Sequence, residues 1–287
     1  MPKKSQAGFT LVELLTVVAV TGVLAALLTT AVSKAKGRAQ LIQCVNNVRQ
    51  QGLGLTGFVA DHHCYPLGFN PNHYQGAYPE HDTFWMSSLA KELGVKMRDT
   101  NNPPLGIASF YCGIFLCPAA VNRAVPIPGT GGWAVNIDYG YNSDGLIRIK
   151  PDGGSDLNSF GLGGHAVAFN KQNHGSTAPP IHPSDIVNPS EMLAIGDGFA
   201  GYKDVLLDTV PWLSRNRDFN GSETQRYLDY RQITKWVHAR HQNRANMVFC
   251  DGHVESLTLE FLFQDTSDEA LRVWNRDHLP HRELLLP

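Results

Sequence analysis

The sequence predicts an α+β protein: one long N-terminal helix, half membrane segment and half amphipathic stem, packed on an antiparallel β-sheet head with long loops. Three observations carry this prediction. Residues 9–32 are apolar or small almost without interruption, helical spacing continues to about residue 60, and the remainder alternates short apolar runs with Pro- and Gly-rich breaks. Short strands with such loops favour an antiparallel sheet, because parallel strands need intervening helices.

The first segment matches the thickness of a membrane. About 20 apolar residues, rising ~1.5 Å each, span a hydrocarbon layer of ~30 Å, and a short basic leader, MPKKSQAG, precedes them. Glu13 is the one formal charge of the segment, and a charge deep in lipid costs roughly 2.5 to 3.5 kcal/mol. If the chain is cut after Gly8, the new ammonium at Phe9 of a neighbouring copy can neutralise Glu13. The positive end of the helix dipole also favours an acid in the first turn.

Gly8, Phe9 and Glu13, placed behind a lysine-containing leader, resemble the type IV prepilin signal shared by pilins and type II secretion pseudopilins. The resemblance implies a pilin-like fold, cleavage between Gly8 and Phe9 by a membrane prepilin peptidase, methylation of the Phe9 amine, and filament assembly guided by Glu13. It also implies a single-pass inner-membrane protein whose head lies in the periplasm or otherwise outside the cytoplasm. The chain then divides into a leader (1–8), an assembly helix (9–32), a stem helix (33–60) and a head (61–287).

The stem continues the helix with apolar residues at three- and four-residue steps. These residues are Ala35, Ala39, Ile42, Val45, Val48, Leu55 and Val59. The stripe predicts a face that packs on the sheet. Gly52, Gly54 and Gly57 each cost up to ~1 kcal/mol in a helix, so we expect fraying or a kink to begin there.

Several elements of the head have recognisable signatures. Residues 84–93 have helical spacing with Gly94 as a stop, FYCGIFLCP indicates a short buried strand or turn, and Ser267 is an N-cap for a short helix that packs Leu271 and Trp274. Strand candidates are residues 133–137, 146–149, 165–169 and 192–195. ANMVFC and HVESL flank Asp251-Gly252 and predict a hairpin with a two-residue type I′ turn.

Composition excludes one class of partner. The 24 Lys and Arg against 26 acids give a net charge of -2, so no nucleic-acid surface is predicted. The five cysteines are odd in number and too few for a disulfide scaffold. Cys112 and Cys117 are near enough in sequence to pair if the head lies outside the cytoplasm; the alternative is that both are small buried hydrophobes.

A histidine and acid cluster is the candidate site of the head. If His241 ends one strand and Asp251 closes the next hairpin, the two side chains lie near each other across the sheet. A His/carboxylate site for a divalent cation would then be built from His241, Asp251, Asp197, His238 and His253. The alternative is that Asp251-Gly252 only forms a turn and that His241 hydrogen-bonds a backbone carbonyl in the core.

The spacing H-x9-DG from His241 to Asp251-Gly252 resembles the processing-associated H-x9-DG domain of prepilin-leader proteins, notably of planctomycete and verrucomicrobial types. Further similar blocks are QCVNNVRQQGLGL, FLCPAA, DYGYNSDG, PSEMLAIGDG and WNRDHLPH. This resemblance implies no defined biochemical activity.

The sequence predicts a structural subunit and not an enzyme, because it lacks G-x-S-x-G, a P-loop GK[ST] and HExxH. We expect it to assemble into a type II secretion or type IV pilus-like filament, with prepilin peptidase, other subunits and the inner membrane as partners, and with no cofactor beyond the candidate cation. Two alternatives stay open: a membrane-anchored extracytoplasmic binding protein that does not polymerise, and a membrane-tethered hydrolase using His241, Asp251 and Asp197.

Overall fold

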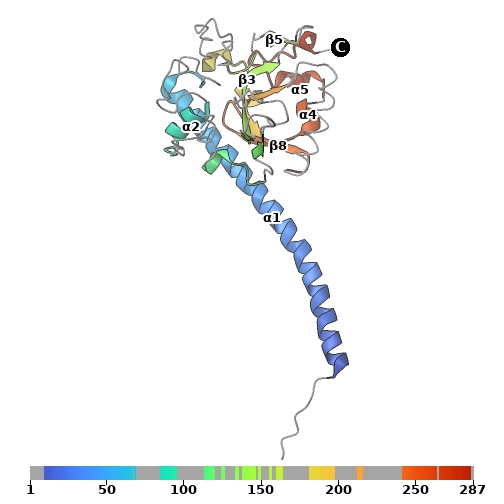
Figure 1. Cartoon of the computed structure of the whole chain (residues 1–287). Coiled ribbons are helices and arrows are strands. Elements are labelled where there is room, and N and C mark those ends of the chain that lie inside the picture. Colours follow the sequence, from blue (N-terminus) through green and yellow to red (C-terminus); the bar gives the residue numbers. More distant parts are fainter. Residues whose placement is uncertain are drawn as a thin grey trace, which may run out of the picture.

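A long helix carries the head at its C-terminal end (Figure 1). The computed structural model describes residues 10–66, 68, 85–95, 113–119, 124–126, 133–135, 138–146, 148–149, 155–156, 160–163, 181–197, 212–215, 241–263 and 265–285. The helices are α1 (Leu11–His62), α2 (Trp85–Glu92), α4 (Leu259–Phe263) and α5 (Asp268–Arg272), with short 3-10 turns η3 (Gly113–Phe115), η4 (Pro183–Asp185), η5 (Pro189–Glu191) and η6 (Arg282–Leu284). The strands are β1 (Ala124–Pro126), β2 (Trp133–Val135), β3 (Tyr139–Leu146), β4 (Arg148–Ile149), β5 (Ser155–Asp156), β6 (Leu193–Asp197), β7 (Trp212–Arg215), β8 (Arg244–Phe249) and β9 (Val254–Thr258).

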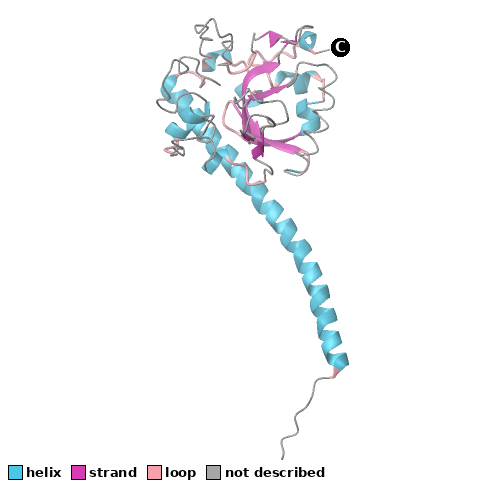
Figure 2. Cartoon of the chain, viewed as in Figure 1, coloured by secondary structure: helices cyan, strands magenta, loops and turns pink. Residues whose placement is uncertain are grey.

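Helix α1 is one continuous helix of 52 residues, close to the predicted length of about 50. Its N-terminal half leaves the head as a stalk (Figure 2), and the large apolar side chains from Leu11 to Val32 are all more than half exposed. By length and composition this half can cross a membrane, and none of its apolar window is buried inside the structure. An exposed apolar surface of this size needs lipid or other helices to cover it.

The head is built on a five-stranded sheet in the order β7-β3-β6-β8-β9. The pairs β3–β6, β6–β8 and β8–β9 are antiparallel, which confirms the predicted α+β class. The edge strand β7 departs from the prediction, because it runs parallel to β3.

The predicted hairpin is confirmed, but its turn type was wrong. Four residues, 250–253, connect β8 to β9, and the Gly252 N–H donates to the Phe249 carbonyl at 2.9 Å. Gly252 has φ of 88°, whereas Asp251 is not among the described residues with positive φ. A type I′ turn needs positive φ at both positions, so the connection is a longer loop with a left-handed glycine.

The sheet has a core on each of its faces, as the alternation along β8 shows. Ala245, Met247 and Phe249 join α4, α5 and Trp274 in one cluster, whereas Val248 packs in the other cluster with α1 and α2. In the second cluster the Trp85 ring stacks on Tyr141 with centroids 5.6 Å apart. The stem helix therefore contributes side chains to the hydrophobic core of the head.

The stem glycines do not end the helix, which continues to His62 without the expected fraying. A Cβ on Gly52 would lie 3.1 Å from Val248 Cγ1, and one on Gly54 would lie 2.9 Å from Leu93 Cδ1. Both positions are buried. The cost of glycine in the helix is therefore offset by close packing of α1 against β8 and the end of α2.

Other local predictions have mixed outcomes. The helix at 84–93 is confirmed as α2 with Gly94 at φ of 61°, and Ser267 caps α5 by accepting from the Ala270 N–H at 3.3 Å. Of the strand or turn predicted for FYCGIFLCP, the described part forms a turn, η3. Strand β3 was missed over most of its length, and the candidate strand 165–169 lies outside the described residues.

Candidate functional site

The first turn of α1 holds Glu13 in a local hydrogen-bond ring with Thr10. The Glu13 side-chain Oε2 accepts from the Thr10 N–H at 2.8 Å and from the Thr10 hydroxyl at 2.7 Å, while the Glu13 N–H donates to Thr10 Oγ1 at 3.2 Å. This is a capping box, which satisfies backbone donors that a helix start leaves open.

The capping box changes the expected role of the acid. From the sequence, we expect Glu13 to need the charge of another molecule before it enters lipid. The structure gives one of its oxygens a partner three residues away, so part of the desolvation cost is offset within the chain. Gly8 and Phe9, the predicted processing site, lie outside the described residues.

A second cluster lies where the stem meets the head. Three side-chain amides of α1 donate to backbone carbonyls of the segment 113–119: Gln40 to Pro118 at 3.0 Å, Asn47 to Leu116 at 2.7 Å, and Gln51 to Ile114 at 2.8 Å. With Cys44 these residues occupy one face of the helix, at steps of three and four. The segment is therefore held to the stem by polar contacts.

This polar face partly replaces the predicted apolar stripe. Val48 and Leu55 are buried as expected, but Ile42 is 61% exposed and Ala35 and Ala39 are exposed. The reason is that the carbonyls of segment 113–119 need donors once buried, and amide side chains supply them.

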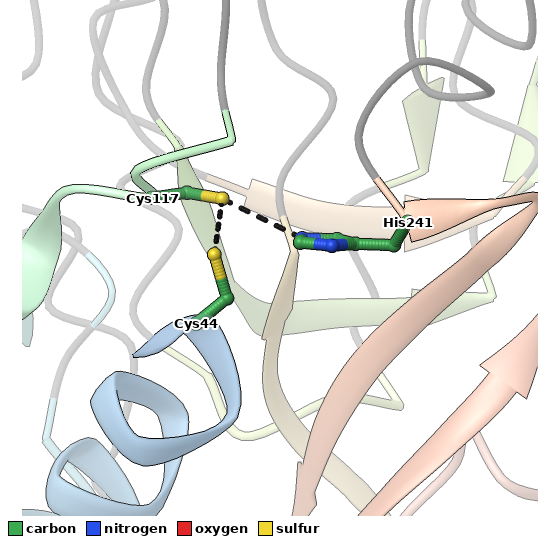
Figure 3. Close-up of side chains that lie close together, drawn as sticks. All are labelled: Cys44, Cys117 and His241. Carbon is green, nitrogen blue, oxygen red and sulfur yellow. Dashed lines mark hydrogen bonds between the residues drawn. The ribbon is translucent and has the colours of Figure 1, made fainter. Parts of the chain in front are cut away.

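The side chains of Cys44, Cys117 and His241 converge at this contact between α1 and segment 113–119 (Figure 3). The Cys44 and Cys117 sulfurs are 2.6 Å apart, and His241 Nε2 lies 3.5 Å from the Cys117 sulfur. All three residues are buried, and among the described residues they are the one group whose ligand atoms are close enough to share a metal ion. Contact with Cys117 lowers the pKa of the Cys44 thiol, although burial opposes that change.

His241 also faces a buried acid. Its Nε2 is 3.5 Å from Asp197 Oδ1, with both side chains essentially unexposed. Burial by itself would lower the pKa of His241, but contacts with Asp197 and Cys117 outweigh it and raise the pKa to about 9. Asp197 Oδ2 accepts from the Asn246 N–H at 2.7 Å, which fixes the carboxylate at the start of β8.

The sequence-predicted cluster divides into two parts. His241 and Asp197 are together, but Asp251 and His253 form a separate exposed pair with 2.6 Å between Oδ1 and Nδ1. The expected contact between His241 and Asp251 was wrong because they flank opposite ends of β8, whose six residues extend about 20 Å. His238 lies outside the described residues.

This division bears on two earlier hypotheses. His241 contacts Asp197 but lies apart from Asp251, so the described residues do not assemble the three-residue cluster on which the hydrolase alternative was based. Asp251 and His253 also lie apart from His241, so they do not join it in the predicted cation site. For the predicted Cys112–Cys117 bridge, the structure describes only Cys117 and places its sulfur against Cys44, whereas Cys112 lies outside the described residues.

The His241–Asp197 pair predicts a pH dependence. Because the pKa of His241 is raised in the fold, its contribution to the free energy of unfolding is complete below pH ~6.5 and is lost as the pH rises through about 9. The change is at most about 3 kcal/mol. Urea titrations of the full chain in detergent with reductant, which keeps Cys117 a thiol, measure it at pH 6, 7.5 and 9. A His241→Asn variant should be less stable but lack this slope, and a flat wild-type profile would contradict the pairing.

Sequence reasoning missed Thr10, Gln40, Cys44, Asn47 and Gln51. Thr10 had a usable signal, the Thr-x-x-Glu spacing of a capping box. The stem residues had a weaker sequence signal, since the polar residues at positions 40, 47 and 51 share a helix face with Cys44. Nothing in the sequence indicated that this face meets a segment more than sixty residues away.

Comparison with known proteins identifies the N-terminal part. Residues 3–29 match the family model of the prokaryotic N-terminal methylation motif. Together with the long apolar helix, this match supports a type IV pilin-like prepilin that is anchored in a membrane by one helix. No curated protein and no solved structure matches the chain.

Proposed function

We propose that this chain is a prepilin-type structural subunit that assembles through its N-terminal helix into a type II secretion or type IV pilus-like filament. The observation that carries the proposal is the methylation motif at residues 3–29, placed at the start of an unbroken 52-residue helix whose apolar half is unburied. Its partners are prepilin peptidase, sister subunits and the inner membrane, with the head in the periplasm or otherwise outside the cytoplasm. The processing-associated H-x9-DG class remains part of this proposal.

The exposed half of α1 supplies the assembly surface. In lipid its apolar side chains are solvated by acyl chains, and in a filament they pack against sister helices. Because lipid is as apolar as these side chains, packing and polar contacts decide between the two states. Subunits that repeat head to tail form an open filament.

Glu13 sets the register in this mechanism. Its Oε2 is engaged by Thr10, and Oε1 is the atom we assign to the Phe9 ammonium of a neighbouring subunit. That ion pair forms only when the copies are correctly staggered, so it selects one axial offset among many apolar contacts of similar energy.

Processing at Gly8 is directly measurable. We expect protein isolated from its host membrane to begin at Phe9 and to carry one added methyl group, as measured by intact-mass and N-terminal peptide mass spectrometry. A Gly8→Val variant, which places a branched side chain at the scissile bond, serves as the unprocessed control. A mature wild-type protein that still begins at Met1 would refute the prepilin pathway.

Assembly is tested separately from processing. Ile42 and Leu53 are exposed stem positions, 61% and 68% accessible. We expect single cysteines placed there to give cross-links between processed subunits in cells. Processed chains that never cross-link would favour a membrane-anchored binding protein that does not polymerise.

A further inference from the structure

We propose that Cys44 and Cys117 form a disulfide that fastens the stem helix to the head in the mature protein. The proposal rests on the proposed function in one respect, the location of the head outside the cytoplasm, where disulfides form and persist. It differs from the Cys112–Cys117 bridge expected from sequence, because it joins two elements far apart in the chain.

Neighbouring residues hold the two thiols close together. Both residues are 0% exposed, and their sulfurs lie 2.6 Å apart although 73 positions separate them in sequence. Hydrogen bonds hold the backbone on each side: Gln40 and Asn47 bind the carbonyls of Pro118 and Leu116, and the Cys117 N–H donates to Asp138 Oδ2 at 2.8 Å. The approach of the sulfurs therefore follows from the docking of segment 113–119 on α1.

A shared zinc ion is the competing explanation, since His241 Nε2 lies 3.5 Å from the Cys117 sulfur. Two thiolates on one tetrahedral zinc, each ~2.3 Å from the metal, stand roughly 3.7 Å apart. The two sulfurs here are more than 1 Å closer than that. They would need to separate to admit an ion, whereas a small approach brings them within bonding reach. The geometry therefore favours a covalent link.

The reaction is a thiol–disulfide exchange with an oxidised dithiol oxidoreductase. The thiolate of one cysteine attacks the disulfide of the oxidoreductase, and a mixed disulfide forms as one thiolate of the oxidoreductase leaves. The second cysteine then attacks the mixed disulfide and releases the other thiolate, so two thiols of this chain are oxidised while one disulfide of the oxidoreductase is reduced. Because both cysteines are buried in the fold, the first exchange precedes the docking of segment 113–119, and the second follows as docking brings the other cysteine to the mixed disulfide.

The position of the link suits a subunit that is pulled by its stem. Cys44 is the buried residue of α1 nearest to the membrane half, and the other buried stem residues follow it toward the head. Force applied through the membrane half reaches the stem–head contact at this end first. A covalent bond there protects the hydrogen bonds of Asn47 and Gln51 from being opened one after another.

The test is peptide mapping of full-length protein from its host membranes, alkylated at lysis and digested without reductant. Trypsin leaves Cys112 and Cys117 together on residues 99–123, so a chymotryptic cut after Phe115 is needed to separate them. We expect a linked peptide pair containing Cys44 and Cys117. It should vanish in Cys117→Ser and persist in Cys112→Ser, and a link between Cys112 and Cys117 would overturn the proposal.

The same sample yields the N-terminal mass, which separates this proposal from the proposed function. Processed protein with both thiols alkylated would overturn the disulfide and leave the filament subunit intact. Stoichiometric zinc, with Cys44 and Cys117 alkylated only after chelation, would overturn it in favour of a metal site. A chain that begins at Met1 but is cross-linked would support the disulfide while refuting the processing pathway.

A stability measurement gives an independent readout. We expect reductant to lower the Tm of the wild-type chain in detergent by roughly 10 °C, because the bond closes a loop of more than seventy residues. Cys44→Ser should already have the lower Tm and respond little to reductant. Cys250→Ser, at a buried cysteine of the hairpin, is the matched control and should keep the full response. Equal responses in Cys44→Ser and wild type would overturn the proposal.

Discussion

Replacement of Glu13 by alanine is expected to leave the protein in the membrane and to abolish its assembly. Removing a carboxylate from an apolar helix lowers the cost of lipid insertion, by less than the roughly 2.5 to 3.5 kcal/mol of a charge at the helix centre because Glu13 lies in the capped first turn, so membrane retention should not fall. The proposed pairing of Glu13 with the Phe9 ammonium of a neighbour is lost, and with it the selection of one stagger. Filament yield in a shearing or cross-linking assay, compared with membrane-fraction immunoblots, measures both effects.

Two variants separate charge from capping. Glu13→Gln keeps a carbonyl oxygen that can accept from Thr10 but has no charge, so it should preserve the helix start and still fail to assemble. Thr10→Ala removes the hydroxyl that caps the helix and contacts Glu13, which should destabilise the first turn by about 1 kcal/mol. This variant should assemble with reduced yield. Normal filaments from Glu13→Gln would show that capping, and not charge, is the role of this acid.

Gly145→Ala is expected to have the largest effect on the stability of the head. Gly145 has φ of 67°, and an added Cβ would lie 2.8 Å from both the Gly161 nitrogen and the Trp274 carbonyl oxygen. These are backbone atoms, which cannot rotate away as a side chain can. We expect a loss of about 3 kcal/mol or more in the free energy of unfolding, from the combined strain and overpacking.

Gly94→Ala is the matched control for this prediction. Gly94 has nearly the same φ, 61°, but nothing within 4 Å of the added Cβ. It should lose only about 1 kcal/mol, because the strain is present without the clash. Urea unfolding of both variants measures the difference. Similar small losses in the two would mean that the strand β3 can move away from Trp274.

Local signals explain what could be predicted. The long helix follows from an apolar run and a three- to four-residue repeat, the β8–β9 hairpin from two apolar runs around Asp-Gly, and α5 from the Ser267 cap. Each of these signals lies within a few residues of the structure that it determines. Their boundaries were close for that reason, and the prediction at Asp251 failed in the length of the connection and in the φ of one residue.

Strand β3 was missed because its stability is not local. Asn142 is buried, and its side-chain nitrogen donates to the carbonyls of Leu193 at 2.7 Å and Trp274 at 2.9 Å. In sequence, YGYNSDGL has the composition of a turn, since Asn, Ser, Asp and Gly all favour one. Pairing with β6 and β7, together with the hydrogen bond to the segment after α5, makes this stretch a central strand.

The sequence by itself determined the N-terminal methylation motif, the apolar half of α1 that is able to cross a membrane, and the position of Glu13, because a short motif and an apolar run are defined by residue order alone. The tertiary structure decided which charged and sulfur-bearing side chains meet. It separated His241 from Asp251 by the length of one strand, paired His241 with Asp197 across β6 and β8, and brought Cys44 on the stem to Cys117 in the head. Contacts over such sequence separations depend on how the stem docks on the sheet, and that docking is set by burial and hydrogen bonding of the whole head.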